Sequence, residues 1–168
     1  KNGLNDTHLI HISSDSVYGN SAGQKNHRWI ETDPLNPLSV YAKTKLQSET
    51  EANKHNGPVL VLRTAFYGIN PNSKKSLLWW IINNAKHGNE MDAWENIFFS
   101  PVSAMQLVII IEYLLEKNII GIFNVGSVDG CNKFDFVYNV CSKIGLKPKI
   151  NRIINRNIKK QDIRPDNS

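Results

Sequence analysis

The sequence predicts an α/β domain with a mostly parallel sheet, and three observations support this fold class. Short apolar runs alternate with longer segments of helical periodicity along the chain. Residues 59–64, VLVLRT, form a near-continuous apolar run, as expected for a strand buried on both faces of a parallel sheet. The 168 residues include 40% hydrophobic and 21% charged side chains, which is ordinary for one globular domain with a real core.

The first part of the chain is interpreted as strand, helix, strand. Residues 8–13, HLIHIS, are short, apolar and β-branched and predict a strand that runs into a turn-rich loop. A polar helix is expected over about residues 39–55, because Gly57 and Pro58 supply the usual stop signals. The apolar run at 59–64 supplies the next strand.

The alternation continues in the middle of the chain. KSLLWWIINNAKHG predicts a helix over about residues 75–87 that stops at Gly88, with a short strand after it. Residues 91–96, MDAWEN, are interpreted as a loop. Ser103 and Gln106 have capping-box spacing, so the next helix should begin there, run to about residue 116 and place its apolar middle against the sheet.

Three further elements are expected toward the C-terminus. GIFNVG, residues 121–126, predicts another buried strand, and KPKINRI, residues 147–153, predicts an edge strand. Asn132 is a candidate cap for a helix between them. The side chains expected on the apolar face of that helix are those of Phe134, Val137, Cys141 and Ile144.

The positive charge is concentrated near the C-terminus. The formal net charge is +5, but residues 143–168 carry eight Lys or Arg against two Asp, whereas the preceding residues carry 12 basic and 13 acidic side chains. No aromatic residue interleaves the C-terminal charges and no nucleic-acid-binding module is visible. A solvated tail or a site for a phosphorylated small ligand is therefore favoured over nucleic-acid binding.

Several classes of protein are not indicated. The densest apolar run, LVIII at 107–111, is far shorter than the roughly 18 residues of a membrane span. Two cysteines and no secretory signal give no disulfide framework, so a cytoplasmic location is expected. The histidines share no metal-ligand spacing with the cysteines, so no metal site is expected.

Tyr41 and Lys45 lie four residues apart in SVYAKTK, on the predicted polar helix. Side chains at this spacing share one helix face, so they can act on the same small volume. A tyrosine is a poor acid–base catalyst at neutral pH, and a neighbouring ammonium favours its ionised form. By itself the pair is also common on solvated helices, so it needs support from elsewhere in the chain.

That support comes from HISSDSVYG, residues 11–19. A strand that ends in Ser13, Ser14 and Asp15 places hydroxyl groups at the carboxyl end of a parallel sheet, where ligands bind in open α/β folds. A serine there can donate a hydrogen bond to a carbonyl oxygen that gains negative charge.

The order of these motifs resembles the extended short-chain dehydrogenase/reductase family. Within it, the run LVLRTAFYGINPNSKKSLLWWIINNAKHG and the ending DIRPDNS look most like the dTDP-4-dehydrorhamnose reductases and their sugar-nucleotide-binding relatives. The resemblance covers about residues 9–168. It implies the C-terminal part of a Rossmann-like doubly wound parallel sheet, carrying the catalytic residues in 1–70. It also implies a small, mixed substrate-binding region in 71–168, with a returning Rossmann strand and helix.

The resemblance also implies roles for single residues. Ser14 would hold the substrate carbonyl, Tyr41 would donate the proton, and Lys45 would contact the nicotinamide ribose and tune Tyr41. Thr64 and Ala65 would lie near the nicotinamide. The residues implied in binding the sugar nucleotide are Asp15, Val17, Phe66 and, in the ending IRPDNS, Arg164.

The implied activity is the NADPH- or NADH-dependent reduction of a keto group on a nucleotide-linked deoxysugar. Two alternatives stay open: an epimerase or dehydratase of the same family, and a non-catalytic regulatory protein on the same scaffold. A dehydratase would be expected to have an acidic residue after Asp15, whereas this chain has Ser16, which argues against that activity. The sequence has no G-x-G-x-x-G turn to bind a pyrophosphate. We therefore expect a fragment, inactive alone, of a full-length protein that could form a homodimer.

Overall fold

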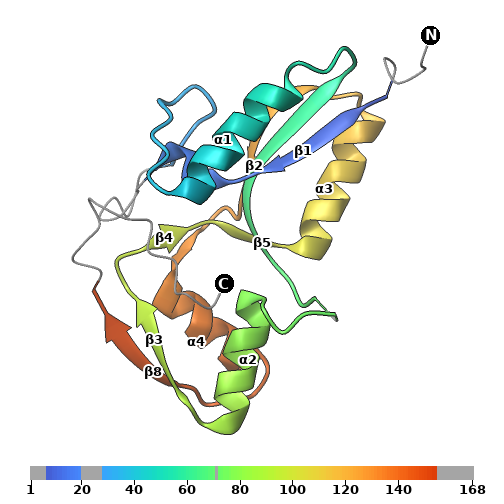
Figure 1. Ribbon diagram of the computed structural model, residues 1–168. Helices are drawn as coiled ribbons and strands as arrows, with labels where there is room; N and C mark the ends of the chain where they lie inside the picture. Colours follow the sequence, from blue (N-terminus) through green and yellow to red (C-terminus); the bar gives the residue numbers. More distant parts are fainter. Residues whose placement is uncertain (1–6, 20–27, 71, 155–168) are drawn as a thin grey trace.

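The computed structural model describes residues 7–19, 28–70 and 72–154, which form two parts, one above the other in Figure 1. Arg164 lies outside the described residues. The upper part is built around a sheet with helices α1 and α3, and the lower part contains helices α2 and α4. The helices are α1 (Val40–Ala52), α2 (Leu77–His87), α3 (Ala104–Glu116) and α4 (Lys133–Lys143), with a short 3₁₀ helix η1 (Asp15–Tyr18).

The upper part holds a four-stranded sheet in which every pairing is parallel. Its central strand β2 (Val59–Tyr67) pairs with β1 (Leu9–Ser13), β5 (Pro101–Ser103) and β6 (Gly121–Val125). The last residue of β1, Ser13, pairs with Arg63 in the middle of β2. The parallel α/β fold expected from the sequence is confirmed, with β5, α3 and β6 returning to this sheet from the second half of the chain.

The two faces of the sheet differ in chemistry because successive side chains of a strand point to opposite faces. One face packs on α3 and is apolar; its residues are Ile10, Ile12, Leu60, Leu62, Phe123 and Val125, with Leu107 from the helix. The other face meets α1 and carries polar side chains among apolar ones: His11 and Ser13 of β1 both hydrogen-bond to α1 side chains. Helix α1 buries little apolar surface: its buried residues are Ala42, Glu49 and Ala52.

The lower part of the molecule is formed by two short two-stranded sheets and two helices. Strands β3 (Glu90–Trp94) and β8 (Lys149–Ile153) pair in parallel, and β4 (Phe98–Phe99) and β7 (Cys131–Asn132) pair antiparallel. A second hydrophobic cluster joins these sheets to α2 and α4. Its buried residues are Ile81, Ala85, Met91, Ala93, Phe136, Val137 and Cys141.

The helix boundaries follow local capping chemistry. Ser39, Ser76, Ser103 and Asn132 each accept a backbone N–H with their side chain at the start of a helix. Helix α2 ends at Gly88, whose φ of 67° lies in the left-handed region that favours glycine. These signals confirm the expected starts at Ser103 and Asn132 and the expected stop at Gly88.

Three expectations from the sequence need correction. Residues 91–94, interpreted as part of a loop, belong to β3, because β8 pairs with them from far along the chain. Helix α4 buries Phe136, which was not expected, while Ile144 is 47% exposed. Strand β2 extends to Tyr67, since its last residues pair with β5.

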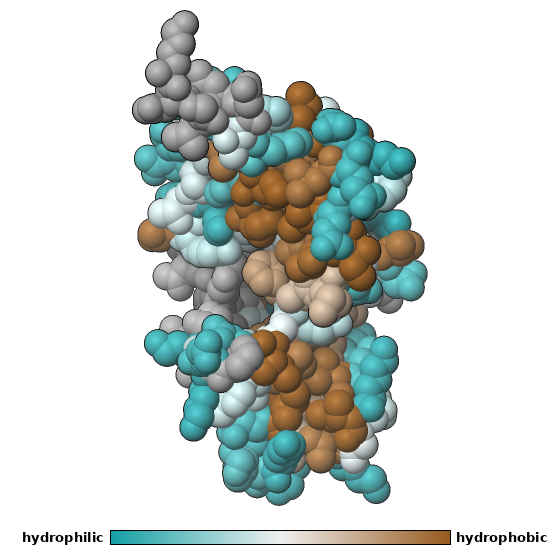
Figure 2. Space-filling view, turned by 90° about the vertical axis from the view of Figure 1, so that its right-hand side faces the viewer, coloured by the Kyte–Doolittle hydropathy of each residue, from teal (hydrophilic) through white to brown (hydrophobic). Residues whose placement is uncertain are grey.

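Helix α3 is apolar on its outer side as well as on the side that faces the sheet. Figure 2 views the molecule from the side on which α3 lies and shows hydrophobic residues gathered over the upper part. The exposed apolar residues of this helix are Met105, Val108, Ile109 and Tyr113. Among the described residues, no helix has both the length and the apolar character to cross a membrane.

Candidate functional site

The site expected from the sequence lies where β1 ends and α1 begins. Ser14 follows β1 directly, is 3% exposed, and caps η1 by accepting the backbone N–H of Ser16. Tyr41 is the second residue of α1 and is 40% exposed, so a ligand can reach it. Lys45 lies one helical turn further on. Its Nζ donates to the carbonyl oxygen of Ile12 at 3.0 Å.

Lys45 therefore connects the two elements of the site. Its Nζ lies 5.9 Å from the centroid of the Tyr41 ring and is bonded to the backbone two residues before Ser14. This geometry places an ammonium group beside the phenol, as the spacing of four residues predicts. It also places the ammonium group beside the end of the strand that Ser14 follows.

The Ser14 hydroxyl lies in a small polar cluster. Its Oγ is 2.8 Å from the Ser16 Oγ and donates to the Asp15 carboxylate at 3.2 Å. Gly19, directly after η1, has a φ of 86°, and a side chain there would collide with the carbonyl oxygen of Asn36. The turn after Ser14 is thus held tightly against the segment that leads to α1.

The structure places the residues implied in substrate binding in different environments. Asp15 is half-buried at the start of η1, next to Ser14. Phe66 is 55% exposed on β2, so its ring is available to a ligand. Val17 has no exposed surface, so no ligand can touch it in this conformation.

The residues implied in cofactor binding lie at the same end of the sheet. Thr64 follows Arg63, the partner of Ser13 in the sheet register, and is 4% exposed. Its buried hydroxyl has no hydrogen-bond partner among the residues that the structure describes. A buried polar group without a partner is costly, so this hydroxyl lowers the stability of the strand that carries it. Ala65, the next residue of β2, is half-buried.

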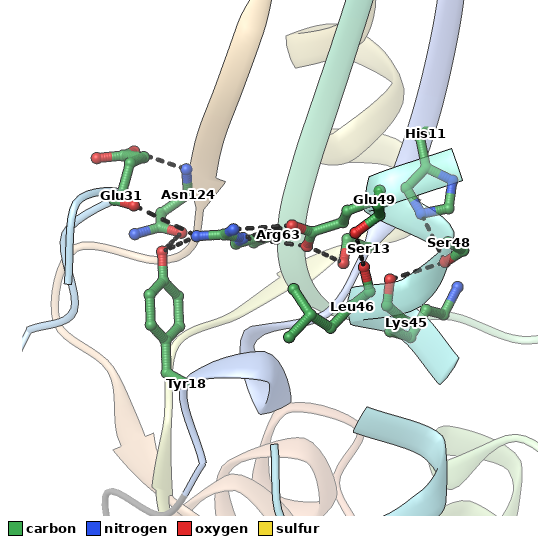
Figure 3. Close-up of polar contacts among 11 residues, drawn as sticks. His11, Ser13, Tyr18, Glu31, Lys45, Leu46, Ser48, Glu49, Arg63 and Asn124 are labelled. Carbon is green, nitrogen blue, oxygen red and sulfur yellow. Dashed lines mark hydrogen bonds and ion pairs between the residues drawn. The ribbon is translucent and has the colours of Figure 1, made fainter. Parts of the chain in front are cut away.

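A buried polar network connects β1, α1 and β2 next to Ser13, and sequence reasoning missed it (Figure 3). Glu49 of α1 and Arg63 of β2 form an ion pair, each with a side chain only 3% exposed. Arg63 donates to the Glu49 carboxylate from Nε at 3.0 Å and from Nη2 at 2.8 Å. The Ser13 hydroxyl donates to the same carboxylate at 2.5 Å.

The network extends to the other side of the guanidinium. Arg63 Nη1 donates to the Tyr18 hydroxyl at 2.8 Å, and that hydroxyl donates to Asn124 Oδ1 at 2.8 Å. Burial by itself would lower the pKa of Arg63, but the hydrogen bonds to Glu49 and Tyr18 raise it above its ordinary value. Arg63 therefore stays charged. The available sequence signal was an arginine inside an otherwise apolar strand, which demands a buried partner.

The segment before α1 is attached to this network. Asn124 donates from its side chain to the carbonyl oxygen of Trp29 at 2.9 Å, and its backbone N–H donates to the Glu31 carboxylate at 2.7 Å. The rings of Tyr18 and Trp29 stack with centroids 5.3 Å apart. These contacts join η1, β6 and the segment before α1.

His11 lies on the same polar face of the sheet. Its Nε2 is 3.0 Å from the Ser48 hydroxyl. Burial and, to a lesser extent, the charge of Lys45 lower the pKa of His11, while Glu49 acts in the opposite direction. His11 is therefore held neutral at physiological pH beside the charged residues of the site.

Metal and thiol chemistry find little support in the described part of the chain. No group of three or more His, Cys, Asp or Glu residues within it could hold a metal ion. Burial raises the pKa of both thiols, Cys131 and Cys141, which keeps them protonated and poorly nucleophilic.

Comparison with known proteins gives a consistent picture. The family model described as RmlD substrate binding domain matches residues 3–168. The dTDP-4-dehydrorhamnose reductase of Escherichia coli is 24% identical over 155 residues, which are 86% of this chain and 50% of that protein. The methionine adenosyltransferase 2 subunit beta of Bos taurus is 26% identical over 82% of this chain and 42% of that protein.

Solved structures share the fold. A dTDP-4-dehydrorhamnose reductase from Clostridium acetobutylicum superposes with a TM-score of 0.80 at 24% identity, covering 95% of this chain and 55% of that one. The enzyme of the same name from Bacillus anthracis, solved in complex with NADP, gives a TM-score of 0.78 at 20% identity over 95% of this chain and 55% of that one.

The chain spans half or less of the length of these curated relatives. The family model nevertheless matches nearly all of its residues, and the parallel sheet agrees with the fold of the solved relatives. The chain belongs to the RmlD substrate binding domain family.

Proposed function

We propose that the protein acts in the NADPH- or NADH-dependent reduction of a keto group on a nucleotide-linked deoxysugar. The observation that carries this proposal is the position of the Lys45 ammonium group. It is hydrogen-bonded to the backbone of Ile12, two residues before Ser14, and it lies 5.9 Å from the centroid of the Tyr41 ring. In this proposal the Ser14 hydroxyl, the Tyr41 phenol and the Lys45 ammonium group act together at the carboxyl end of β1, since ligands bind at strand ends in open α/β folds.

Each residue has a defined task in this reaction. Ser14 donates a hydrogen bond to the substrate carbonyl oxygen and stabilises the negative charge that develops there. Tyr41 delivers a proton to that oxygen, so the ketone becomes an alcohol, and the ammonium group of Lys45 favours the tyrosinate that remains. A bound NADPH or NADH would supply the hydride to the carbonyl carbon.

The ligands are assigned by the same logic. Lys45, Tyr41, Thr64 and Ala65 would hold the nicotinamide end of the cofactor, as the family resemblance implies. In support, Lys45 is hydrogen-bonded to the end of β1, and Thr64 and Ala65 follow the residue of β2 that pairs with Ser13. The Bacillus anthracis relative, solved with NADP, supports this choice of cofactor. Asp15, Phe66 and, outside the described residues, Arg164 would contact the sugar nucleotide, whose main binding surface would lie in residues 71–168.

A Tyr41→Phe substitution tests the proposal. The substitution is made in the full-length protein that contains this chain. We expect kcat to fall by about 10²-fold or more, because the proton donor is lost. NADPH oxidation with a dTDP-4-keto-6-deoxysugar measures it. Tyr113→Phe is the control, since Tyr113 is exposed on α3. A Tyr41→Phe kcat within about threefold of wild type would exclude the general-acid role.

A regulatory protein on the same scaffold is the second candidate, supported by the similarity to the methionine adenosyltransferase subunit. Mass spectrometry of the purified protein, together with turnover by the unmodified protein, separates the two. Bound nucleotide sugar together with turnover supports the reductase. Binding without turnover supports the regulatory role. An epimerase or dehydratase would instead retain NAD⁺ through the catalytic cycle and return it in its original redox state.

A further inference from the structure

The buried ion pair between Glu49 and Arg63 requires an explanation beyond stability. Removing two charges from water is expensive, and apolar replacements of buried ion pairs in other proteins are often neutral or stabilising. Here the charges are well satisfied: the Glu49 carboxylate accepts from Ser13 and Arg63, and Nε, Nη1 and Nη2 of Arg63 all donate. Such a network fixes the relative orientation of the elements that it joins.

The network joins the two elements that carry the candidate catalytic groups. On one side, Ser13 is the residue before Ser14, and Tyr18 is the last residue of the turn that Ser14 caps. On the other side, Glu49 lies one helical turn after Lys45 on α1, and therefore on the same face of that helix.

The contacts act on both ends of the short turn. Glu49 binds the hydroxyl of Ser13 before the turn, and Arg63 binds the hydroxyl of Tyr18 at its end, 2.8 Å away. The turn from Ser14 to Tyr18 is thus fastened at both ends to one ion pair, and that pair is anchored in α1 and β2 (Figure 3).

We infer that Glu49, Arg63 and Tyr18 are positioning residues, which fix the turn that begins at Ser14 against helix α1. They thereby set the alignment of the Ser14 hydroxyl with Tyr41 and Lys45. The expected effect of these residues on catalysis rests on the proposed function. Its structural content, the attachment of the turn to the helix, can be measured without turnover.

Tyr18→Phe is the most selective test. It keeps the ring that stacks on Trp29 and leaves the ion pair intact, but removes the hydroxyl between Arg63 and Asn124. We expect kcat to fall about tenfold or more with KM within about threefold, because small misplacements of reacting groups cost rate. Tyr138→Phe, at an exposed tyrosine of α4, is the matched control and should change neither constant.

Amide hydrogen exchange on the full chain gives the second readout. In Tyr18→Phe the amides of η1 and of the first turns of α1 should exchange faster, while those of β2 keep their protection. Arg63→Lys, which keeps the charge but not the branched donors, should give the same local pattern. If amide exchange became faster to the same extent throughout the protein, the network would contribute to stability alone. If exchange did not change, the network would not attach the turn to the helix. Either result would overturn the inference.

The two proposals fail in different ways. An unmodified protein without reductase turnover contradicts the proposed function, and the exchange pattern then decides the positioning role. An active protein whose kcat is unchanged in Tyr18→Phe contradicts the positioning role and leaves the proposed function standing.

Discussion

At the scale of single residues, Glu49 shows that the burial of a helix side chain depends on the part of the sheet against which the helix packs. It lies in a helix of polar composition, yet it is 3% exposed, because α1 rests on the face of the sheet that carries Ser13 and Arg63. Its neighbour Glu51, two residues later, pairs with Lys54 in solvent. Two glutamates of one helix thus experience opposite environments, and only the buried one has a counter-charge that solvent cannot replace.

This contrast gives a stability prediction. Glu49→Gln leaves the guanidinium of Arg63 buried without its counter-charge, which should lower the free energy of unfolding by about 3–5 kcal/mol. Glu51→Gln removes an exposed pair and should cost less than about 1 kcal/mol. Urea unfolding of both variants measures the difference. Equal losses would mean that the ion pair is not buried in solution.

At the scale of elements, the helices begin where short polar side chains cap them. Ser103 is the clearest case: its Oγ accepts the backbone N–H of Gln106 at 3.2 Å, and Gln106 Oε1 accepts the backbone N–H of Ser103 at 2.9 Å. This reciprocal arrangement satisfies two donors that the helix itself leaves free. It also fixes the point at which β5 turns into α3, and so the seat of α3 on the apolar face of the sheet.

Ser103→Ala should therefore destabilise the protein by about 1 kcal/mol, through loss of the cap. Ser142→Ala, at an exposed serine near the end of α4, removes a hydroxyl without a capping role and should change stability by less than about 0.5 kcal/mol. Thermal or urea unfolding reports both values. A Ser142→Ala loss as large as that of Ser103→Ala would contradict the importance of the capping box.

At the scale of the whole molecule, two hydrophobic clusters stabilise two parts of different character. The upper cluster lies between the parallel sheet and α3, and the lower one lies among α2, α4 and the short sheets. The face of the upper sheet that meets α1 adds a pH-dependent contribution, because the half-buried His11 lies there near Lys45 and Glu49. The overall stability is thus expected to depend on the protonation of this half-buried histidine.

The sign of this dependence follows from the lowered pKa of His11. Below the ordinary histidine value of 6.5, the unfolded chain binds a proton that folded His11 does not yet accept, so the free energy of unfolding should fall as the pH decreases. His11→Asn, which cannot titrate, should show a shallower fall between neutral pH and about pH 5. Urea unfolding at several pH values measures the two slopes. Identical slopes would show that His11 does not contribute.

Local sequence was enough to predict most of the helices and strands and the spacing of the candidate catalytic residues. Caps such as Ser103 and stops such as Gly88 act over three or four residues, so they are visible in the local sequence. The same is true of Tyr41 and Lys45, since one turn of helix brings them together wherever the helix lies. The apolar run of β2 likewise indicates a buried parallel strand before any partner is known.

The tertiary structure alone decided which residues became partners across the molecule. Strand β3 exists because β8 pairs with it, and no local pattern in residues 91–94 announces that partner. Arg63 meets Glu49, Tyr18 and Asn124 because α1 packs on one particular face of the sheet. Local sequence fixes backbone preference and periodicity. The environment of a buried charge depends instead on long-range packing, which brings together residues that no short window of sequence contains.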